Sequence, residues 1–173
     1  MNLRKNIITA LLLAIGFILR QLVPGVIGGM KFDLMLSVIF ISILINPEFK
    51  NVMLTALLGG LITAMTTTFP GGQLPNIIDK LITCSIVFMM IKAAGKSSNS
   101  MLGIGAITFL GTNISGTVFL LSALFLVGLP VPFMTLYMGI VLPTSIANIF
   151  MTLLIYKAVT IGLKFSGVKY IHE

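Results

Sequence analysis

Long hydrophobic runs separated by short polar breaks make up almost the whole chain. A helix needs about 20 residues, at about 1.5 Å per residue, to cross the roughly 30 Å hydrocarbon core of a bilayer. The pattern therefore predicts an all-α integral membrane protein in which about six transmembrane helices form a single bundle. One domain is expected over residues 1–173. The predicted spans cover about residues 6–23, 32–45, 52–68, 76–91, 101–127 and 133–156.

Three of the predicted spans depart from a regular transmembrane helix. The run over 32–45 is short for a bilayer, so it is expected to rely on cover from loops or neighbouring helices. The fifth run is expected to break at Gly-Thr-Asn, residues 111–113. In the sixth run Pro143 is expected to loosen the helix, because proline lacks a backbone N–H. Residues 92–100 form a predicted polar loop between the fourth and fifth spans.

The composition excludes an ordinary soluble protein. Of the 173 residues, 57% are hydrophobic and only 9% are charged, and the mean hydropathy is +1.13. The net charge of +7 could indicate nucleic acid, but the basic residues lie at the ends of the hydrophobic runs, as membrane topology requires. We therefore expect the lipid bilayer as a partner and no nucleic acid.

The distribution of lysine and arginine predicts how the bundle is oriented in the membrane. Three basic residues, Arg20, Lys31 and Lys80, fall on one side of the predicted spans, and eight fall on the other. Because cytoplasmic loops carry the excess of lysine and arginine, both termini are predicted to be cytoplasmic, and residues 28–33 and 66–80 to face outside. The eight are Arg4, Lys5, Lys50, Lys92, Lys96, Lys157, Lys164 and Lys169.

Residues 66–80 combine two prolines, two glycines, two amides, an acid and a base in an otherwise nearly uncharged chain. Within them Asp79 shares a helical face with Asn76 and Thr83, and Lys80 borders that face. These charges could simply lie at the membrane interface, with Asn76 capping the helix. Ionisable groups within spans are also costly and tend to face a cavity or a partner, so a role in ligand binding is equally open.

A second outer loop, residues 28–33, carries a comparable set of groups. Asp33 opens the next predicted helix, where an acid favours the positive end of the helix dipole. The preceding glycine pair would let the backbone approach a small molecule closely, and Lys31 adds a cation. Acids and bases together suit a zwitterion such as a free amino acid, whose carboxylate would face Lys31 or Lys80 and whose ammonium would face Asp33 or Asp79.

Polar residues also lie deep in the fifth and sixth predicted spans. Tyr137, Thr144 and Asn148 are separated by seven and four residues and so share a helical face. Such side chains commonly hydrogen-bond neighbouring helices within the membrane, but a buried amide can also bind a ligand. Both interpretations stay open for Asn113 and Asn148. The full set is Thr112, Asn113, Ser115, Thr117, Tyr137, Thr144, Ser145 and Asn148.

Motifs for catalysis are weak. His172 is the only histidine, so the chain has no HExxH motif, no Ser-His pair and no Cys/His metal cluster. Gly95-Lys96-Ser97 looks like the end of a phosphate-binding loop, but Met90 stands where that motif needs its first glycine. We expect no enzymatic activity and no cofactor, and any ATP would be used by a partner.

Residues 28–33 (GGMKFD) and 67–80 (TTFPGGQLPNIIDK), in a hydrophobic chain of this length, resemble the tryptophan-specific substrate-binding (S) components of energy-coupling factor transporters. The resemblance covers essentially the whole chain, and these two loops are its specific part. It implies six membrane helices with cytoplasmic termini in a prokaryotic cell membrane. The absence of tryptophan from the chain fits a protein that relieves tryptophan shortage.

The resemblance also implies partners. Such a component captures L-tryptophan or a similar small molecule from outside and docks on a transmembrane scaffold subunit that carries two cytoplasmic ATPases. It is thought to topple in the bilayer to release the substrate inward. In that family a small-xxx-small motif in the first helix meets the scaffold, and Ala10 and Ala14 fit it. The site lies near the outer face between helices four to six, under the first and third loops.

These considerations give a set of predicted ligand residues. Charged residues would hold the zwitterion, amides and a threonine would supply hydrogen bonds, and Tyr137 or Phe69 would stack on the indole. The alternatives are an S component for another amino acid or a vitamin, a structural subunit of a membrane complex, or a membrane enzyme without familiar motifs. The predicted residues are Lys31, Asp33, Phe69, Gln73, Asn76, Asp79, Lys80, Asn113, Tyr137, Thr144 and Asn148.

Overall fold

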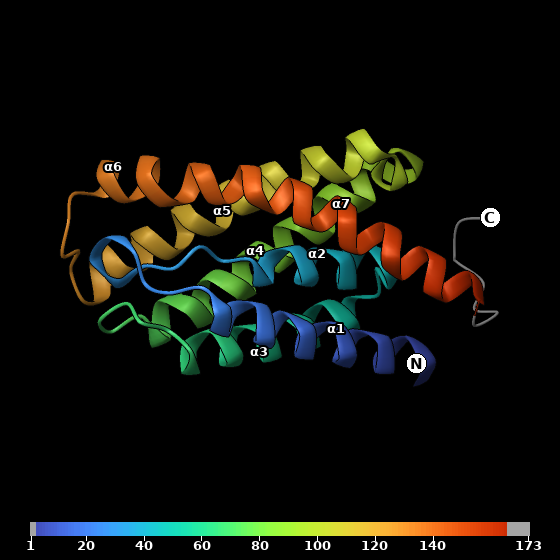
Figure 1. Ribbon diagram of the computed structural model, residues 1–173, viewed down its shortest axis with the longest axis horizontal. Coiled ribbons are helices and arrows are strands. Elements are labelled where there is room, and N and C mark those ends of the chain that lie inside the picture. The colour runs from blue at the N-terminus through green and yellow to red at the C-terminus, as the bar shows by residue number, and fades with distance from the viewer. Residues whose placement is uncertain (1–2, 166–173) are drawn as a thin grey trace.

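The computed structural model describes residues 3–165, and every regular element among them is a helix (Figure 1). Lys169 and His172 lie outside the described residues. Short 3-10 turns, η1 (Ile27–Gly29) and η2 (Gly95–Asn99), precede α2 and α5. The helices are α1 (Leu3–Leu22), α2 (Met35–Ile45), α3 (Phe49–Met65), α4 (Gln73–Ala94), α5 (Met101–Leu126), α6 (Phe133–Leu136) and α7 (Leu142–Phe165).

The last two helices form one continuous rod. A π-helical turn, η3 (Tyr137–Val141), joins α6 directly to α7. Pro143 follows this turn; its ring would clash with the carbonyl one turn back, and it has no N–H to donate. A wider turn accommodates both effects, so the expected loosening of the helix is confirmed. The described part of the chain therefore contains six helical rods, each matching one of the predicted spans.

The predicted break in the fifth span is wrong, because α5 runs without interruption over 26 residues. Gly111 is a packing position: a Cβ there would lie 2.9 Å from ring or methyl carbons of Phe40 and Val87. The amide of Asn113 donates to the carbonyl of Phe109, one turn earlier, at 2.8 Å. A small residue and a locally bonded amide are both compatible with a continuous helix.

The short helix α2 lies at the centre of the bundle. All 11 of its residues are buried, and it packs against α1, α3, α4, α5 and α7. Neighbouring helices thus cover it on every side, which confirms the expectation drawn from its length. Its side chains form much of the main hydrophobic core, together with residues of α1, α3, α4 and α5.

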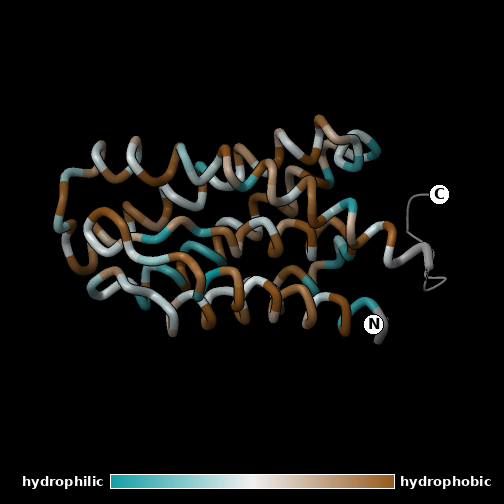
Figure 2. Tube along the Cα trace, viewed as in Figure 1, coloured by the Kyte–Doolittle hydropathy of each residue, from teal (hydrophilic) through white to brown (hydrophobic). Residues whose placement is uncertain are grey.

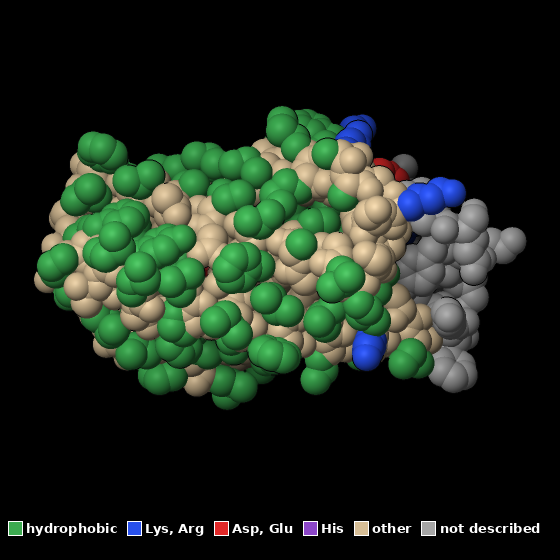
Figure 3. Space-filling view, turned by 90° about the horizontal axis from the view of Figure 1, so that it is seen from above, with side chains coloured by type: hydrophobic (Ala, Val, Ile, Leu, Met, Phe, Trp, Pro, Cys, Tyr) green, Lys and Arg blue, Asp and Glu red, His purple; other side chains and the backbone are tan. Residues whose placement is uncertain are grey.

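The outer surface of the bundle is hydrophobic. Hydrophobic residues predominate along the helices (Figure 2) and cover the face seen in Figure 3, where lysine and arginine appear only toward one end. Among the described residues α1, α5 and the rod over Phe133–Gly162 are each long and apolar enough to cross a membrane, and α2 and α3 are shorter apolar helices. Together with the composition, this is the surface of a membrane protein.

The two ends of the bundle differ. The helix α1 begins and α7 ends at the same end of the molecule, which we call the terminal end (Figure 1). The segments 23–34, 66–72 and 127–132 gather at the opposite end, which we call the loop end (Figure 1). Residues 28–33 and 66–80, the two polar stretches singled out in the sequence, therefore meet at one end of the fold.

Candidate functional site

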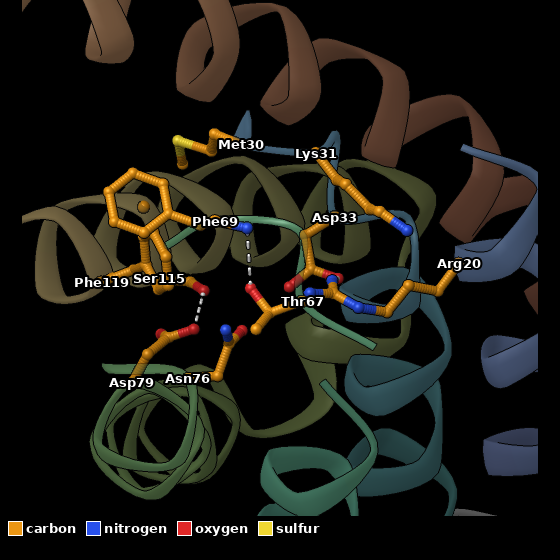
Figure 4. Close-up of a pocket in the computed structure, with 11 residues that line it drawn as sticks. Arg20, Met30, Lys31, Asp33, Thr67, Phe69, Asn76, Asp79, Ser115 and Phe119 are labelled. Atoms are coloured by element: carbon orange, nitrogen blue, oxygen red, sulfur yellow. Dashed lines mark hydrogen bonds and ion pairs between the residues drawn. The ribbon is translucent and has the colours of Figure 1, made fainter. Parts of the chain in front are cut away.

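A cavity opens within the bundle near the loop end, between α1, α4, α5 and the segments that carry residues 30–33 and 67–69 (Figure 4). We call it the main cavity. It has a volume of about 380 Å³, which includes space open to solvent. Its walls are formed by Arg20, Met30, Lys31, Asp33, Thr67, Phe69, Asn76, Asp79, Ser115, Gly116 and Phe119.

Four charged side chains beside this cavity form an alternating chain, which we call the charge chain. Arg20 Nη1 lies 2.8 Å from Asp33 Oδ1, and Lys80 Nζ lies 2.7 Å from Asp33 Oδ2. The same Lys80 ammonium also contacts Asp79. Two cations and two carboxylates leave no formal net charge, which suits a buried position because an unpaired charge there would be costly.

Hydroxyl groups complete the bonding of this chain. Thr83 donates to Asp79 Oδ1 at 2.8 Å, and Ser115 donates to Asp79 Oδ2 at 2.9 Å. At the other end Arg20 Nε donates to Thr66 Oγ1 at 2.9 Å. The charge chain and these hydroxyl groups thus connect α1, the segment before α2, α4 and α5. Asp79 and Thr83 lie on the same face of α4, as predicted, and the hydrogen bond between them shows it directly.

The structure shows that neither Asn76 nor Asp33 caps the helix that follows it in the sequence interpretation. The helix α4 begins at Gln73, three residues before Asn76, so Asn76 does not cap it; its amide donates instead to the carbonyl of Gly72 at 2.6 Å. The residue that caps α2 is Leu34, and the carboxylate of Asp33 is bonded to cations instead.

Lys80 occupies the middle of the charge chain, away from the cavity. It is fully buried, and its ammonium is shared between Asp33 and Asp79. It is absent from the cavity wall. Its position favours a role in holding the two acids in place over direct contact with a ligand.

The opposite wall of the main cavity is aromatic and apolar. The rings of Phe69 and Phe119 pack edge to face with their centroids 5.3 Å apart, and Met30 lies beside them (Figure 4). Phe69 is almost completely buried. The cavity therefore has a charged side and an aromatic side, as an amphipathic ligand requires.

The two polar loops are bonded to each other above the site. Thr68 Oγ1 donates to the carbonyl of Gly29 at 2.6 Å. Gly29 has a φ of +77°, and a Cβ there would lie 2.6 Å from the carbonyl oxygen of Thr68. Only glycine combines this backbone conformation with so close an approach. The first and third loops are thus held together, and their expected function as a cover over the site remains a prediction.

A second, smaller cavity adjoins the first, between α5, residues 30–36 and the rod of η3 and α7. We call it the side cavity, and its volume is about 230 Å³, again including open space. It shares four wall residues with the main cavity: Met30, Lys31, Asp33 and Gly116. Its complete wall consists of Met30, Lys31, Asp33, Leu36, Thr112, Gly116, Ile140, Val141 and Thr144.

Several predicted ligand residues lie outside both cavity walls. Asn148 is fully buried, but its amide donates to the Asp33 carbonyl at 3.1 Å and its oxygen accepts from Ser37 at 2.9 Å. Tyr137 donates to Asn113 Oδ1 at 3.0 Å. Gln73 is exposed at the start of α4. These contacts indicate helix-to-helix bonding for Asn113, Tyr137 and Asn148, whereas Lys31, Asp33, Phe69, Asn76, Asp79 and Thr144 do line a cavity.

The sequence interpretation missed one charged wall residue, Arg20. Because Arg20 lies at the end of a hydrophobic run, it was counted only among the basic residues of the outer side. In the structure it is 4% exposed and lines the main cavity. An arginine inside an apolar run is an ionisable group within a span, and that signal alone could have identified it. Ser115 stood out as polar but not as part of the site, because its bond to Asp79 joins positions 36 residues apart.

The predicted scaffold-contact residues lie elsewhere. Ala10 and Ala14 are both exposed on α1. They share an exposed strip with larger apolar residues such as Leu11 and Ile18, which are 61% and 59% exposed. Small residues on such a strip allow another helix to approach closely.

Comparisons with known proteins identify relatives of this chain. The family described as "Tryptophan transporter TrpP" matches residues 2–164. A "Probable tryptophan transport protein" of Clostridium acetobutylicum is 45% identical over 159 residues, which is 92% of this chain and 93% of the relative. Proteins of the same description from Bacillus subtilis and Clostridium perfringens are 41% and 40% identical, each over at least 95% of both chains. No solved structure matches the chain.

Proposed function

The chain belongs to the tryptophan transporter TrpP family, and from that premise we propose that it is the S component of an energy-coupling factor importer that captures L-tryptophan outside the cell. The observation that carries the proposal is the main cavity, whose wall holds both signs of charge and which adjoins a mainly apolar side cavity. A tryptophan zwitterion carries both charges and a large apolar ring. Because its relatives are named as transport proteins, we propose no enzymatic activity of its own.

We propose that six helices span a prokaryotic cell membrane, with both termini in the cytoplasm and the loop end outward. The terminal end holds Lys5, Lys50, Lys92, Lys96 and Lys157 near the ends of helices, whereas the loop end holds three cations, Arg20, Lys31 and Lys80. This asymmetry follows the positive-inside rule. In this orientation the main cavity, near the loop end, would lie on the side from which substrate arrives.

Within the main cavity the ligand carboxylate would lie between Lys31 and Arg20, and the ammonium beside Asp79 and Asn76. Partial burial and then repulsion by Arg20 lower the pKa of the Lys31 ammonium, and a ligand carboxylate would offset that repulsion. Asp79 accepts hydrogen bonds on both oxygens from protein donors, and it keeps lone pairs for one more. Asn76 donates through its nitrogen, which leaves its side-chain oxygen as an acceptor.

Energy for uptake would come from partners: a transmembrane scaffold subunit and two cytoplasmic ATPases. We propose that the exposed strip of α1 around Ala10 and Ala14 meets the scaffold. Ala14→Phe in the complete transporter should abolish uptake while leaving tryptophan binding by the purified chain unchanged. Uptake at the normal rate would contradict this contact.

The binding function can be tested with the intrinsic fluorescence of the ligand. The chain has three tyrosines and no tryptophan, so bound tryptophan can be excited at the red edge of its absorption with little signal from the protein. Titration of the purified protein should give a saturable blue shift, because the indole enters an apolar cavity. No saturable shift from a monodisperse sample would rule out the tryptophan assignment.

A further inference from the structure

The main and side cavities share four wall residues and therefore adjoin each other. We propose that one ligand occupies both: its charged head lies in the main cavity, its indole ring lies in the side cavity, and Thr144 accepts the indole N–H. This assignment rests on the proposed function, because it takes tryptophan as the ligand. It makes Thr144 the residue that distinguishes an indole from a ring without an N–H.

The side cavity has the composition that an indole needs. Leu36, Ile140 and Val141, together with Met30, make most of its surface apolar. Its uncharged polar side chains are the hydroxyls of Thr112 and Thr144. A buried indole presents an apolar body and a single N–H donor, and that donor needs an acceptor. Apart from Lys31 and Asp33, which are also part of the main cavity, this wall is apolar with hydroxyl acceptors, and such a wall matches an indole.

Of the two hydroxyls, Thr144 is the better acceptor. Its Oγ1 donates to the Ile140 carbonyl at 2.6 Å, which uses its only hydrogen and leaves its lone pairs free. The oxygen of Thr112 already accepts from Asn148 at 3.2 Å. Thr144 therefore presents an acceptor and no donor to the cavity.

The aromatic side of the main cavity fits the ring less well. Met30, Phe69 and Phe119 offer no side-chain acceptor for an N–H. The two phenylalanine rings also pack against each other, so that the edge of one occupies a face of the other. In the main cavity the acceptors are on Asp33, Asp79, Asn76 and nearby hydroxyls, which the charged head requires.

Gly116 lies where the two cavities adjoin and is part of both walls. A Cβ at this position would lie 2.4 Å from Val141 Cγ1. The same glycine also brings α5 close to the π-helical turn, which positions the apolar wall for the indole.

The test compares tryptophan with its isostere β-(3-benzothienyl)alanine, in which sulfur replaces the indole N–H. The wild-type chain should bind tryptophan about tenfold more tightly than the isostere, measured by competition against tryptophan fluorescence. Thr144→Val should weaken tryptophan binding about tenfold and change isostere binding less than about twofold. Thr144→Ser, which keeps the hydroxyl, should retain the preference for tryptophan.

Equal losses for both ligands in Thr144→Val, or no loss for either, would overturn the assignment. If this variant does not fold, the wild-type preference decides, and a ratio near one overturns the assignment. These results differ from failure of the proposed function, in which the wild-type chain would bind no tryptophan. A larger loss of tryptophan binding in Phe119→Leu than in Thr144→Val would place the ring on the aromatic side of the main cavity and so contradict the assignment.

Discussion

Two buried polar clusters hold the helices of this protein together, one at each end. At the loop end the charge chain joins Arg20, Asp33, Lys80 and Asp79 beside the main cavity. At the terminal end an uncharged cluster joins α1, α2 and α3 through hydrogen bonds among side chains. It consists of Thr9, Ser42, Asn51 and Thr55, all of them buried.

The side chains of the terminal-end cluster form hydrogen bonds with one another and with nearby backbone carbonyls. Thr9 donates to Asn51 Oδ1 at 2.9 Å, and Ser42 donates to Thr9 Oγ1 at 3.1 Å. The Asn51 amide donates to the backbone carbonyl of Asn46 at 2.9 Å. None of these side chains is part of the wall of either described cavity. Polar residues of this kind bind helices to one another and need no ligand.

The two clusters differ in ways that separate the proposed binding site from structural hydrogen bonding between helices. Both clusters are buried and polar, so burial and polarity do not separate them. The loop-end cluster differs in carrying charge and in presenting Arg20, Asp33 and Asp79 to a cavity. Asn148 resembles the terminal-end cluster, because its hydrogen bonds all go to neighbouring protein groups.

Removing the central cation should have the largest effect. Lys80→Met removes the cation that the partly buried Asp33 and the buried Asp79 share and leaves Asp79 without a cationic partner, which should cost about 3–5 kcal/mol of stability. The melting temperature in detergent should fall steeply. Lys96→Met, an exposed position at the terminal end, is the matched control and should melt like the wild type. Equal melting temperatures for both variants would show that the charge chain contributes little to stability.

Neutralising the cavity acid should mainly affect binding. Asp79→Asn preserves the shape of the side chain but removes the charge facing the ligand ammonium, so tryptophan affinity should fall about a hundredfold. Glu48→Gln, which neutralises an exposed acid just before α3, should leave affinity unchanged. Fluorescence titration measures both. If the Asp79→Asn variant bound tryptophan with wild-type affinity, Asp79 would have a structural role and no role in binding the ligand.

Separating the two loops should have an intermediate effect. Gly29→Ala strains the backbone and pushes against the Thr68 carbonyl, so we expect about tenfold weaker tryptophan binding. Gly95 also has a positive φ, +52°, but a Cβ there would meet nothing within 4 Å. Gly95→Ala therefore controls for backbone strain alone. Matching affinities in these two variants would contradict a role for the loop contact in binding.

The smallest effect is expected in the terminal-end cluster. Ser42→Ala removes hydrogen bonds to Thr9 and Thr55, and stability should fall by about 1 kcal/mol. Tryptophan affinity should stay within about twofold of the wild type. Thermal denaturation and ligand titration on the same preparation separate the two quantities. A marked loss of affinity would mean that the two ends of the molecule are coupled.

Much of the fold could be predicted from the sequence because hydrophobic runs record helix length directly. Each of the six predicted spans corresponds to a helical rod, and the short second run is the buried centre of the bundle. The break at residues 111–113 was mispredicted because glycine can mark either a turn or a close contact. Only the neighbours of Gly111, which are Phe40 and Val87, distinguish the two.

The candidate site was predictable only in part. Charged residues are rare in spans, so Asp79 and Lys80 stood out, and Asp33 stood out at the start of one. Which of them face a cavity depends on contacts between distant segments, such as the pairs that Asp33 makes with Arg20 and Lys80. For the same reason the sequence could not separate Thr144, which lines a cavity, from Asn148, which does not.

The central claim is that the loop-end cavity binds both charges of a tryptophan zwitterion. The most direct measurement titrates the wild-type protein with L-tryptophan, with tryptamine, which lacks the carboxylate, and with indole-3-propionate, which lacks the ammonium. Tryptamine would leave Lys31 and Arg20 without a carboxylate, and indole-3-propionate would leave Asp79 without an ammonium. Each analogue should therefore bind at least about a hundredfold more weakly than tryptophan. If either analogue bound as tightly as tryptophan, the charged wall would not be the recognition element, and the claim that the cavity binds both charges would be wrong.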